Sequence, residues 1–168
     1  TQQIDTSGMT LEFTYNGEAK VITGASAKTD ITYYLVGENN SETVITSVTN
    51  AGAYNIKVVA ADSDFYRSAE AIVTVVVEKA DQVFNLDNII RSFEYTGTEV
   101  SIGYATAKGE AQLTYIINEV SLESTYYTFA NVGTYSLVVY AAETDNYKAG
   151  YSDPVTITVS LGTAVYEG

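Results

Sequence analysis

The sequence predicts an all-β protein made of two tandem β-sandwich modules, and two observations support this prediction. The stretch from Asn50 to Tyr66, NAGAYNIKVVAADSDFY, returns from Asn131 to Tyr147 as NVGTYSLVVYAAETDNY. Short runs of alternating apolar and polar residues, rich in β-branched residues and tyrosine, also follow one another along the chain, as is typical of half-buried strands. A repeated set of short strands separated by turns indicates stacked sheets.

The repeat extends over most of both halves of the chain and sets the expected module boundaries. We place a first module at 1–80, a second module at 81–161 and a C-terminal tail at 162–168. The joint between the modules contains no stretch rich in Gly, Pro or Ser, which predicts a short, stiff connection and a rod of two units. Further matched pairs are Gln2 with Gln82, Phe13 with Phe93, Tyr15 with Tyr95, Gly17 with Gly97, Thr32 with Thr114, and Tyr33 with Tyr115.

The strands are expected in the same order in each module. Turn residues separate the runs at Asn16-Gly17, at Thr96-Gly97 and between Gly37 and Ser41. The alternation predicts strands at 19–26, 30–37, 42–48, 53–60 and 70–79 in the first module, and at 99–107, 111–120, 125–132, 134–142 and 153–162 in the second.

Each copy of the repeated stretch places a tyrosine two residues after a glycine, at Gly52 and Tyr54 and again at Gly133 and Tyr135. This placement resembles the tyrosine corner of immunoglobulin-like sandwiches. We expect each ring to pack at the edge of the core, with its hydroxyl bonded to nearby backbone, and each glycine to permit positive φ in the turn.

The same comparison predicts a core without a disulfide, since the chain contains no cysteine. In antibody-type domains a cysteine follows the corner tyrosine by two residues. Ile56 and Leu137 stand there, so packing alone is expected to hold the two sheets together. Further along the repeat, Tyr66 and Tyr147 are expected to fold back over the sheet edge.

Taken together, FTYNG with FEYTG, the two long repeated stretches and the closing VTVVVEKA resemble the bacterial immunoglobulin-like repeats of the MBG type. Such repeats occur in tandem in large cell-surface and secreted proteins. The resemblance implies an extracellular location at the bacterial cell surface, a role as stalk or adhesin spacer, and neighbouring domains in a longer chain. The second module departs from the pattern, because VTITVSLG lacks the Lys-Ala of VEKA. No catalytic residues are carried over.

Composition disfavours several other functions. The formal net charge is −13, which repels phosphate backbones and anionic lipid, so neither a nucleic-acid partner nor membrane binding is expected. No apolar run approaches the roughly 20 residues of a membrane helix. The chain contains no histidine and no recognisable catalytic motif, so we expect no enzyme.

A binding role for the second module is the alternative to a spacer. The chain has 15 tyrosines and no tryptophan, and most tyrosines without a repeat partner belong to the second module. Exposed rings can bind carbohydrate or a host surface protein, although tyrosine also simply favours strands. Of Tyr126 and Tyr127, one should face solvent; a binding module should show three or more rings on one open face. The candidate ligand-binding residues are Tyr104, Tyr126, Tyr127 and Tyr151.

Acidic turns offer a candidate calcium site. Asp62 and Asp64 in the first module, and Glu143 and Asp145 in the second, are oxygen donors, and Ca²⁺ takes about six to eight of these. Each turn supplies only two carboxylates, and Asp is common in turns for structural reasons. We therefore favour structural turns over a calcium site, and we expect no other cofactor. A lysine–asparagine isopeptide bond at Lys57 is disfavoured, because its side chain should point outward.

Overall fold

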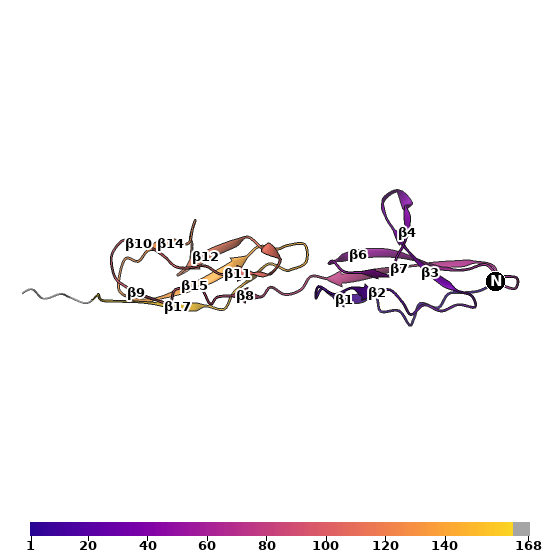
Figure 1. Cartoon of the computed structure of the whole chain (residues 1–168), viewed down its shortest axis with the longest axis horizontal. Coiled ribbons are helices and arrows are strands. Elements are labelled where there is room, and N and C mark those ends of the chain that lie inside the picture. The colour runs from indigo at the N-terminus through magenta and orange to yellow at the C-terminus, as the bar shows by residue number, and fades with distance from the viewer. Residues whose placement is uncertain (163–168) are drawn as a thin grey trace, which may run out of the picture. The chain divides into compact units, whose positions relative to one another are not determined.

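A computed structural model describes residues 1–162 of the chain (Figure 1). From residue 163 onward the expected tail at 162–168 lies outside the described residues. The chain divides into two compact units, Thr1–Ala80 and Asp81–Gly168, which are called unit 1 and unit 2 below.

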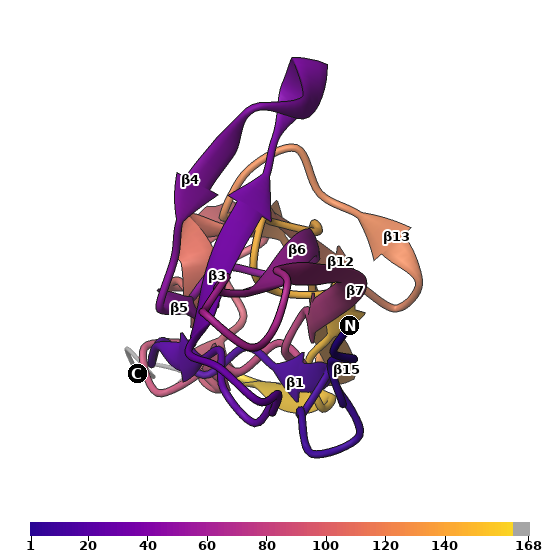
Figure 2. The same cartoon turned by 90° about the vertical axis from the view of Figure 1, so that its right-hand side faces the viewer.

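Unit 1 has a main sheet of five strands in the order β1-β7-β6-β3-β4. A second layer is formed by a two-stranded sheet, β2-β5, and by an isolated bridge between Asp5 and Ser26. The β3–β4 hairpin, closed by the short 3₁₀ helix η1 (Glu38–Asn40), extends away from the rest of unit 1 (Figure 2). The strands are β1 (Glu12–Thr14), β2 (Lys20–Val21), β3 (Ile31–Val36), β4 (Glu42–Val44), β5 (Ser47–Val48), β6 (Gly52–Ala60) and β7 (Ala69–Glu78).

Unit 2 repeats this plan with small additions. Its main sheet has the order β13-β12-β15-β17-β9, and β16 also pairs with β15. The second layer contains β10-β14 and β8-β11, with η2 (Lys108–Glu110) following β11. The strands are β8 (Phe84–Asn85), β9 (Ser92–Glu94), β10 (Glu99–Ser101), β11 (Thr106–Ala107), β12 (Leu113–Ile117), β13 (Val120–Ser121), β14 (Tyr126–Thr128), β15 (Gly133–Ala141), β16 (Gly150–Tyr151) and β17 (Val155–Ser160).

Each unit has its own hydrophobic core between the layers. Ile56 in unit 1 and Leu137 in unit 2 are fully buried at the positions where antibody-type domains carry cysteine. Around them pack Val58, Val75 and Val77 in unit 1, and Val139, Ile157 and Val159 in unit 2. The predicted all-β fold of two immunoglobulin-like sandwich modules is confirmed.

Several of the predicted strands are two shorter strands in the structure. The alternation of apolar and polar residues does not show where the chain stops pairing with one strand and begins to pair with another. The run at 42–48 contains β4, which pairs with β3, and β5, which pairs with β2 in the other layer. The run at 111–120 turns back on itself at Asn118 and Glu119, whose φ values are 47° and 69°. Only β2 of the run at 19–26 forms a regular strand.

The first and last strands of each main sheet pair in parallel, which the sequence did not predict. In unit 1, Glu12 of β1 pairs with Val76 of β7, and the pairing continues to Thr14 with Glu78. In unit 2, Ser92 of β9 pairs with Thr158 of β17 in the same sense. The segment before each first strand contacts the second layer, and the chain then crosses to the edge of the main sheet.

Candidate functional site

The two corner tyrosines have the geometry expected of them. The Tyr54 hydroxyl donates to the Asn50 carbonyl at 2.6 Å, and the Tyr135 hydroxyl donates to the Asn131 carbonyl at 2.7 Å. Gly52 and Gly133 have φ values of 155° and 139°, which side chains rarely tolerate. These contacts close a turn within each unit, so their role is structural.

A second repeated tyrosine links the two layers, a role that the sequence reading did not assign. The Tyr33 hydroxyl accepts the backbone N–H of Ala25 at 3.1 Å, and the Tyr115 hydroxyl accepts that of Ala105 at 2.9 Å. Tyr115 is only 8% exposed. The matching of Tyr33 with Tyr115 in the repeat was the available signal, and its meaning required the tertiary contact.

The matched glutamines, Gln2 and Gln82, attach the first segment of each unit to the rest of that unit through side-chain hydrogen bonds. The Gln2 amide NH₂ donates to the carbonyl oxygens of Ala61 and Arg67, at 3.1 and 2.9 Å. Its Oε1 accepts the backbone N–H of Lys28 at 3.1 Å. In unit 2 the Gln82 Oε1 accepts the backbone N–H of Lys108 at 2.7 Å, and the Gln82 amide NH₂ donates to the Lys108 carbonyl at 3.1 Å. These side chains replace backbone pairing where the entering chain is irregular.

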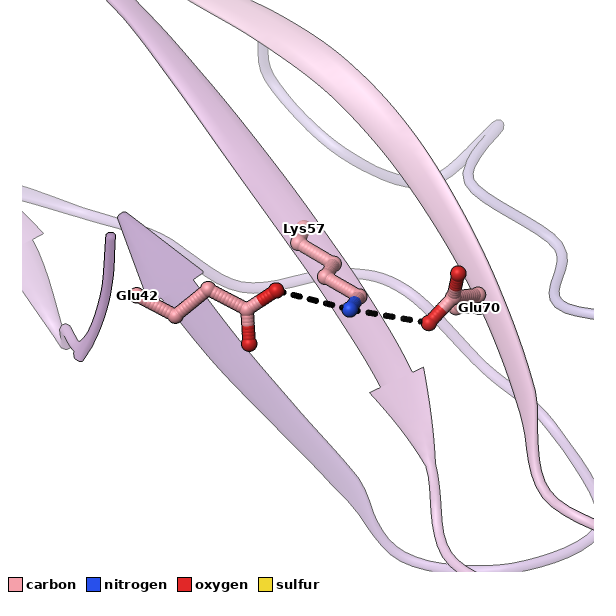
Figure 3. A network of polar contacts seen from close by, with 3 residues as sticks. All are labelled: Glu42, Lys57 and Glu70. Carbon is pink, nitrogen blue, oxygen red and sulfur yellow. Dashed lines mark hydrogen bonds and ion pairs between the residues drawn. The ribbon is translucent and has the colours of Figure 1, made fainter. Parts of the chain in front are cut away.

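The outer face of the main sheet in unit 1 carries a charged network (Figure 3). Lys57 Nζ lies 2.8 Å from Glu42 Oε1 and 3.0 Å from Glu70 Oε2. Hydrogen bonds to Glu42 and then Glu70 raise the pKa of Lys57 above its ordinary value of 10.5. The ammonium group is therefore charged and paired with carboxylates, which is not the arrangement that an isopeptide bond to asparagine requires.

The equivalent face of unit 2 is apolar and aromatic. The repeat places Val138 where unit 1 has Lys57, and Tyr140 where it has Val59. Tyr140 is opposite Tyr151 in the β15–β16 pair, and their ring centroids lie 4.9 Å apart. An open groove of about 560 Å³ lies on this face, lined by Ile116, Asn118, Glu119, Ser136, Val138 and Tyr151.

The four candidate ligand-binding tyrosines do not share one face. Tyr104 and Tyr126, 53% and 55% exposed, belong to the second layer, whereas Tyr151, 67% exposed, belongs to the main sheet. The Tyr127 ring is half-buried and packs against the core, 4.9 Å from that of Phe129, so Tyr126 is the one of the two that faces solvent. The even spacing of Tyr127 from Phe129 was the signal that it faces inward, since alternate residues of a strand share a face.

The candidate calcium ligands lie in exposed turns. Asp62 Oδ1 accepts the backbone N–H of Ser68 at 3.2 Å. Within residues 1–162, no group of three or more acidic side chains is placed to hold a metal ion. Asp62, Asp64, Glu143 and Asp145 are all exposed.

Both of these turns have the same backbone design. The N–H of Ser63 donates to the Tyr66 carbonyl at 2.8 Å, and that of Thr144 donates to the Tyr147 carbonyl at 3.0 Å. The Ser63 and Thr144 hydroxyls accept the N–H groups of Tyr66 and Tyr147 in return, at 3.1 and 3.0 Å. Tyr66 and Tyr147 are half-buried at these turns. These hydrogen bonds show that both acidic segments form turns.

Comparison with known proteins gives distant likenesses in structure alone. No protein-family model matches the chain. No curated protein sequence matches it either. A pair of titin domains in complex with telethonin is 14% identical, with a TM-score of 0.47, and the alignment covers 98% of both chains.

Two further likenesses are to longer chains. Three domains of Drosophila N-cadherin match at 15% identity and a TM-score of 0.40, over 90% of this chain and 64% of that one. A SusE-like, surface-located polysaccharide-binding protein of the Bacteroides thetaiotaomicron heparin utilisation locus matches at 13% and 0.31, over 95% and 34%. At these TM-scores the likenesses carry no conclusion about function. Within the described residues, no helix has the length and apolarity to span a membrane.

Proposed function

We propose that the chain is a structural repeat of a bacterial cell-surface or secreted protein, of the MBG type, and that it acts as a load-bearing stalk or adhesin spacer. The parallel pairing of the first and last strands of the main sheet in each unit is the observation that carries this proposal. We call the β1–β7 pair and the β9–β17 pair the terminal clamps. The partners on this view are neighbouring domains of a longer chain, and no catalytic residue is assigned.

The terminal clamps are oriented to resist tension along the chain. In a chain held at both ends, force pulls on the start of β1 and on the end of β7. Because these strands are parallel, the two pulls act in opposite directions along the strands and load their hydrogen bonds together in shear. In unit 1 these bonds include Val76 N–H to the Leu11 carbonyl and Tyr15 N–H to the Glu78 carbonyl, both 2.8 Å.

The same bonds recur in unit 2. Thr158 N–H donates to the Arg91 carbonyl at 2.9 Å, and Tyr95 N–H donates to the Ser160 carbonyl at 2.8 Å. The residues kept in both copies close turns, link layers or hold the entering chain. A module whose repeated residues maintain its shape is what a spacer requires, and the MBG resemblance supports an extracellular location.

Single-molecule stretching of the full chain tests the load-bearing role. Tyr95→Pro removes the N–H that bonds Ser160, whereas Tyr95→Ala removes a partly exposed ring and keeps the N–H. We expect two unfolding events in the wild type, each releasing roughly 200–250 Å of chain. Tyr95→Pro should lower the force of one event and leave the other unchanged.

Unit 1 serves as the internal reference in this experiment, and Tyr95→Ala controls for the loss of the side chain. Equal unfolding forces in wild type and Tyr95→Pro would show that the terminal clamp does not bear the load. Surface exposure of the intact parent protein, measured by protease shaving of whole cells, tests the proposed location. A parent protein confined to the cell interior would contradict the spacer role.

Binding of carbohydrate or of a host surface protein by unit 2 is the second candidate function. The apolar, aromatic outer face of its main sheet favours this candidate, because unit 1 carries the Glu42–Lys57–Glu70 network on the equivalent face. The other exposed candidate tyrosines, Tyr104 and Tyr126, lie in the second layer and give no comparable surface.

A further inference from the structure

We propose that the groove beside Tyr151 binds a neutral glycan, an inference that rests on the second candidate function and specifies its site and ligand. The outer face of the unit 2 main sheet combines an aromatic ring, an apolar floor and a polar rim. Tyr151 is 67% exposed, and Ile116 and Val138 are half-buried beside it as a cross-strand pair. Asn118, Glu119 and Ser136 complete the lining.

The Tyr151 ring packs against the ring of Tyr140. Its centroid lies 4.9 Å from that of Tyr140, with 47° between the ring planes. Tyr140 is half-buried on the central strand β15, directly opposite Tyr151. A ring supported in this way loses little conformational entropy when a second flat surface stacks on it, which favours binding.

A β-bulge next to Tyr151 distinguishes unit 2 from unit 1. Tyr140 and Leu137 are three residues apart on β15, but their partners Tyr151 and Val155 are four residues apart. The Ser152 hydroxyl accepts the N–H of Val139 at 2.9 Å, which satisfies the backbone at the bulge.

In unit 1 the equivalent strands, β6 and β7, pair without interruption from Gly52–Val77 to Ala60–Ala69. Bulges of this kind redirect a side chain and are common beside binding sites. The extra residue in unit 2 therefore accompanies the change from a charged face to an aromatic one.

The chemistry of the groove fits a sugar. The apolar face of a pyranose ring packs on an aromatic ring, and its hydroxyls need hydrogen-bonding partners at the edge. The Asn118 amide, the Glu119 carboxylate and the Ser136 hydroxyl supply donors and acceptors for them. Asn118 is oriented by its Oδ1, which accepts the N–H of Ser136 at 2.9 Å.

Charge and size exclude other occupants. The groove is lined by no lysine or arginine, and the chain has a net charge of −13, so a sulfated or carboxylated polysaccharide would be repelled. Six residues line the groove. A specific protein–protein interface uses roughly 20–30 residues on each side, so the groove suits a small ligand better than a second copy of the chain or another protein.

Titration of the full ¹⁵N-labelled chain with neutral oligosaccharides tests the site. The probes are cellohexaose, xylohexaose, mannohexaose and chitohexaose, each up to about 10 mM, with polygalacturonate as the anionic probe. We expect at least one neutral probe to shift the amide resonances of Tyr151 and Asn118, while those of Lys57 in unit 1 stay unchanged. Tyr151→Ala should weaken this binding by about tenfold or more.

Two variants make the test specific. Tyr126→Ala removes a ring of similar exposure from the other layer and should leave the affinity unchanged. Val138→Lys introduces the unit 1 residue into the groove and should weaken binding, as Tyr151→Ala does. Both substitutions are on outer faces, and the dispersion of the amide spectrum verifies that each variant is folded.

Several results would overturn the proposal. These are the absence of shifts with every neutral probe, tighter binding of polygalacturonate, or a Tyr151-dependent dimer in sedimentation. Binding that survives Tyr151→Ala but not Tyr126→Ala would retain a glycan-binding function and reject this site. The stretching experiment is independent of all these results, so failure here leaves the spacer function untouched.

Discussion

At the scale of single residues, the repeated tyrosine hydroxyls bond the backbone in two ways, across the layers and within a turn. Tyr115 accepts the backbone N–H of Ala105 across the layers, and Tyr135 donates to the Asn131 carbonyl within a turn. The first contact is buried and the second is exposed to water. The difference matters because an unpaired backbone group is costly only where water cannot replace its partner.

This difference predicts an order of stability among tyrosine variants. Tyr115→Phe should destabilise unit 2 by about 1–3 kcal/mol, since the Ala105 N–H is left buried without a partner. Tyr135→Phe should cost less, about 0.5–1.5 kcal/mol, because water can reach the Asn131 carbonyl. Tyr135→Ala and Tyr54→Ala should each cost several kcal/mol, up to about 3–5, through loss of ring packing.

Urea denaturation followed by residue-resolved NMR measures these free energies of unfolding separately for each unit. The unit without the substitution serves as the control in every variant. If Tyr54→Ala and Tyr135→Ala had the wild-type free energy of unfolding, the tyrosine corners would not contribute to stability. A Tyr115→Phe variant as stable as Tyr135→Phe would show that the contact across the layers is dispensable.

At the scale of elements, alternation predicted the strands well and their partners poorly. The runs at 53–60 and 134–142 became β6 and β15, because both faces of each strand have a regular pattern. The run at 42–48 was divided because its two ends join different layers. The local alternation does not indicate which layer a strand joins, since exposed β4 and partly buried β5 both belong to the same alternating run.

The Glu42–Lys57–Glu70 network predicts a pH dependence of unit 1. The pKa of Lys57 is raised above 10.5 by its two carboxylate partners, so the stabilisation is fully present below pH 10.5. It is lost as the pH rises through the folded-state pKa of the lysine. The wild type should therefore lose melting temperature above pH 10.5 more steeply than Lys57→Met, while the two behave alike at lower pH except for a constant offset.

Differential scanning calorimetry of both proteins between pH 8 and 12 makes this comparison, because the two proteins differ only at residue 57. The network lies at the surface, so added salt should reduce the difference. Parallel curves for wild type and Lys57→Met across the whole range would show that the ion pairs do not contribute to folding.

At the scale of the whole molecule, each unit closes its own core. The Ile56 cluster draws all its members from unit 1, and the Leu137 cluster draws all of its members from unit 2. Each sandwich is well above the roughly 40 residues below which disulfides or metals are usually needed, but it buries a smaller fraction of its surface than a larger domain does. Two closed cores are nevertheless the arrangement expected of repeats that can be added one after another.

We therefore predict that the fragments 1–80 and 81–162 fold separately. Each should give a dispersed amide spectrum, and most resonances should coincide with those of the full chain. The two melting transitions of the full chain should match those of the fragments. A fragment that is unfolded on its own would show that the expected module boundaries do not separate independent domains.

The sequence by itself determined the repeat, the strand-rich modules, the glycine–tyrosine corners and the apolar residues at the disulfide positions. These features depend on side-chain periodicity and turn residues, which are local properties of the chain. Only the tertiary structure decided that the first and last strands of each main sheet pair in parallel, that Tyr127 packs inward while Tyr126 faces solvent, and that Tyr140 packs against Tyr151 beside a groove. Each of these results depends on register and contact between segments far apart in the sequence, which are settled when the layers pack together.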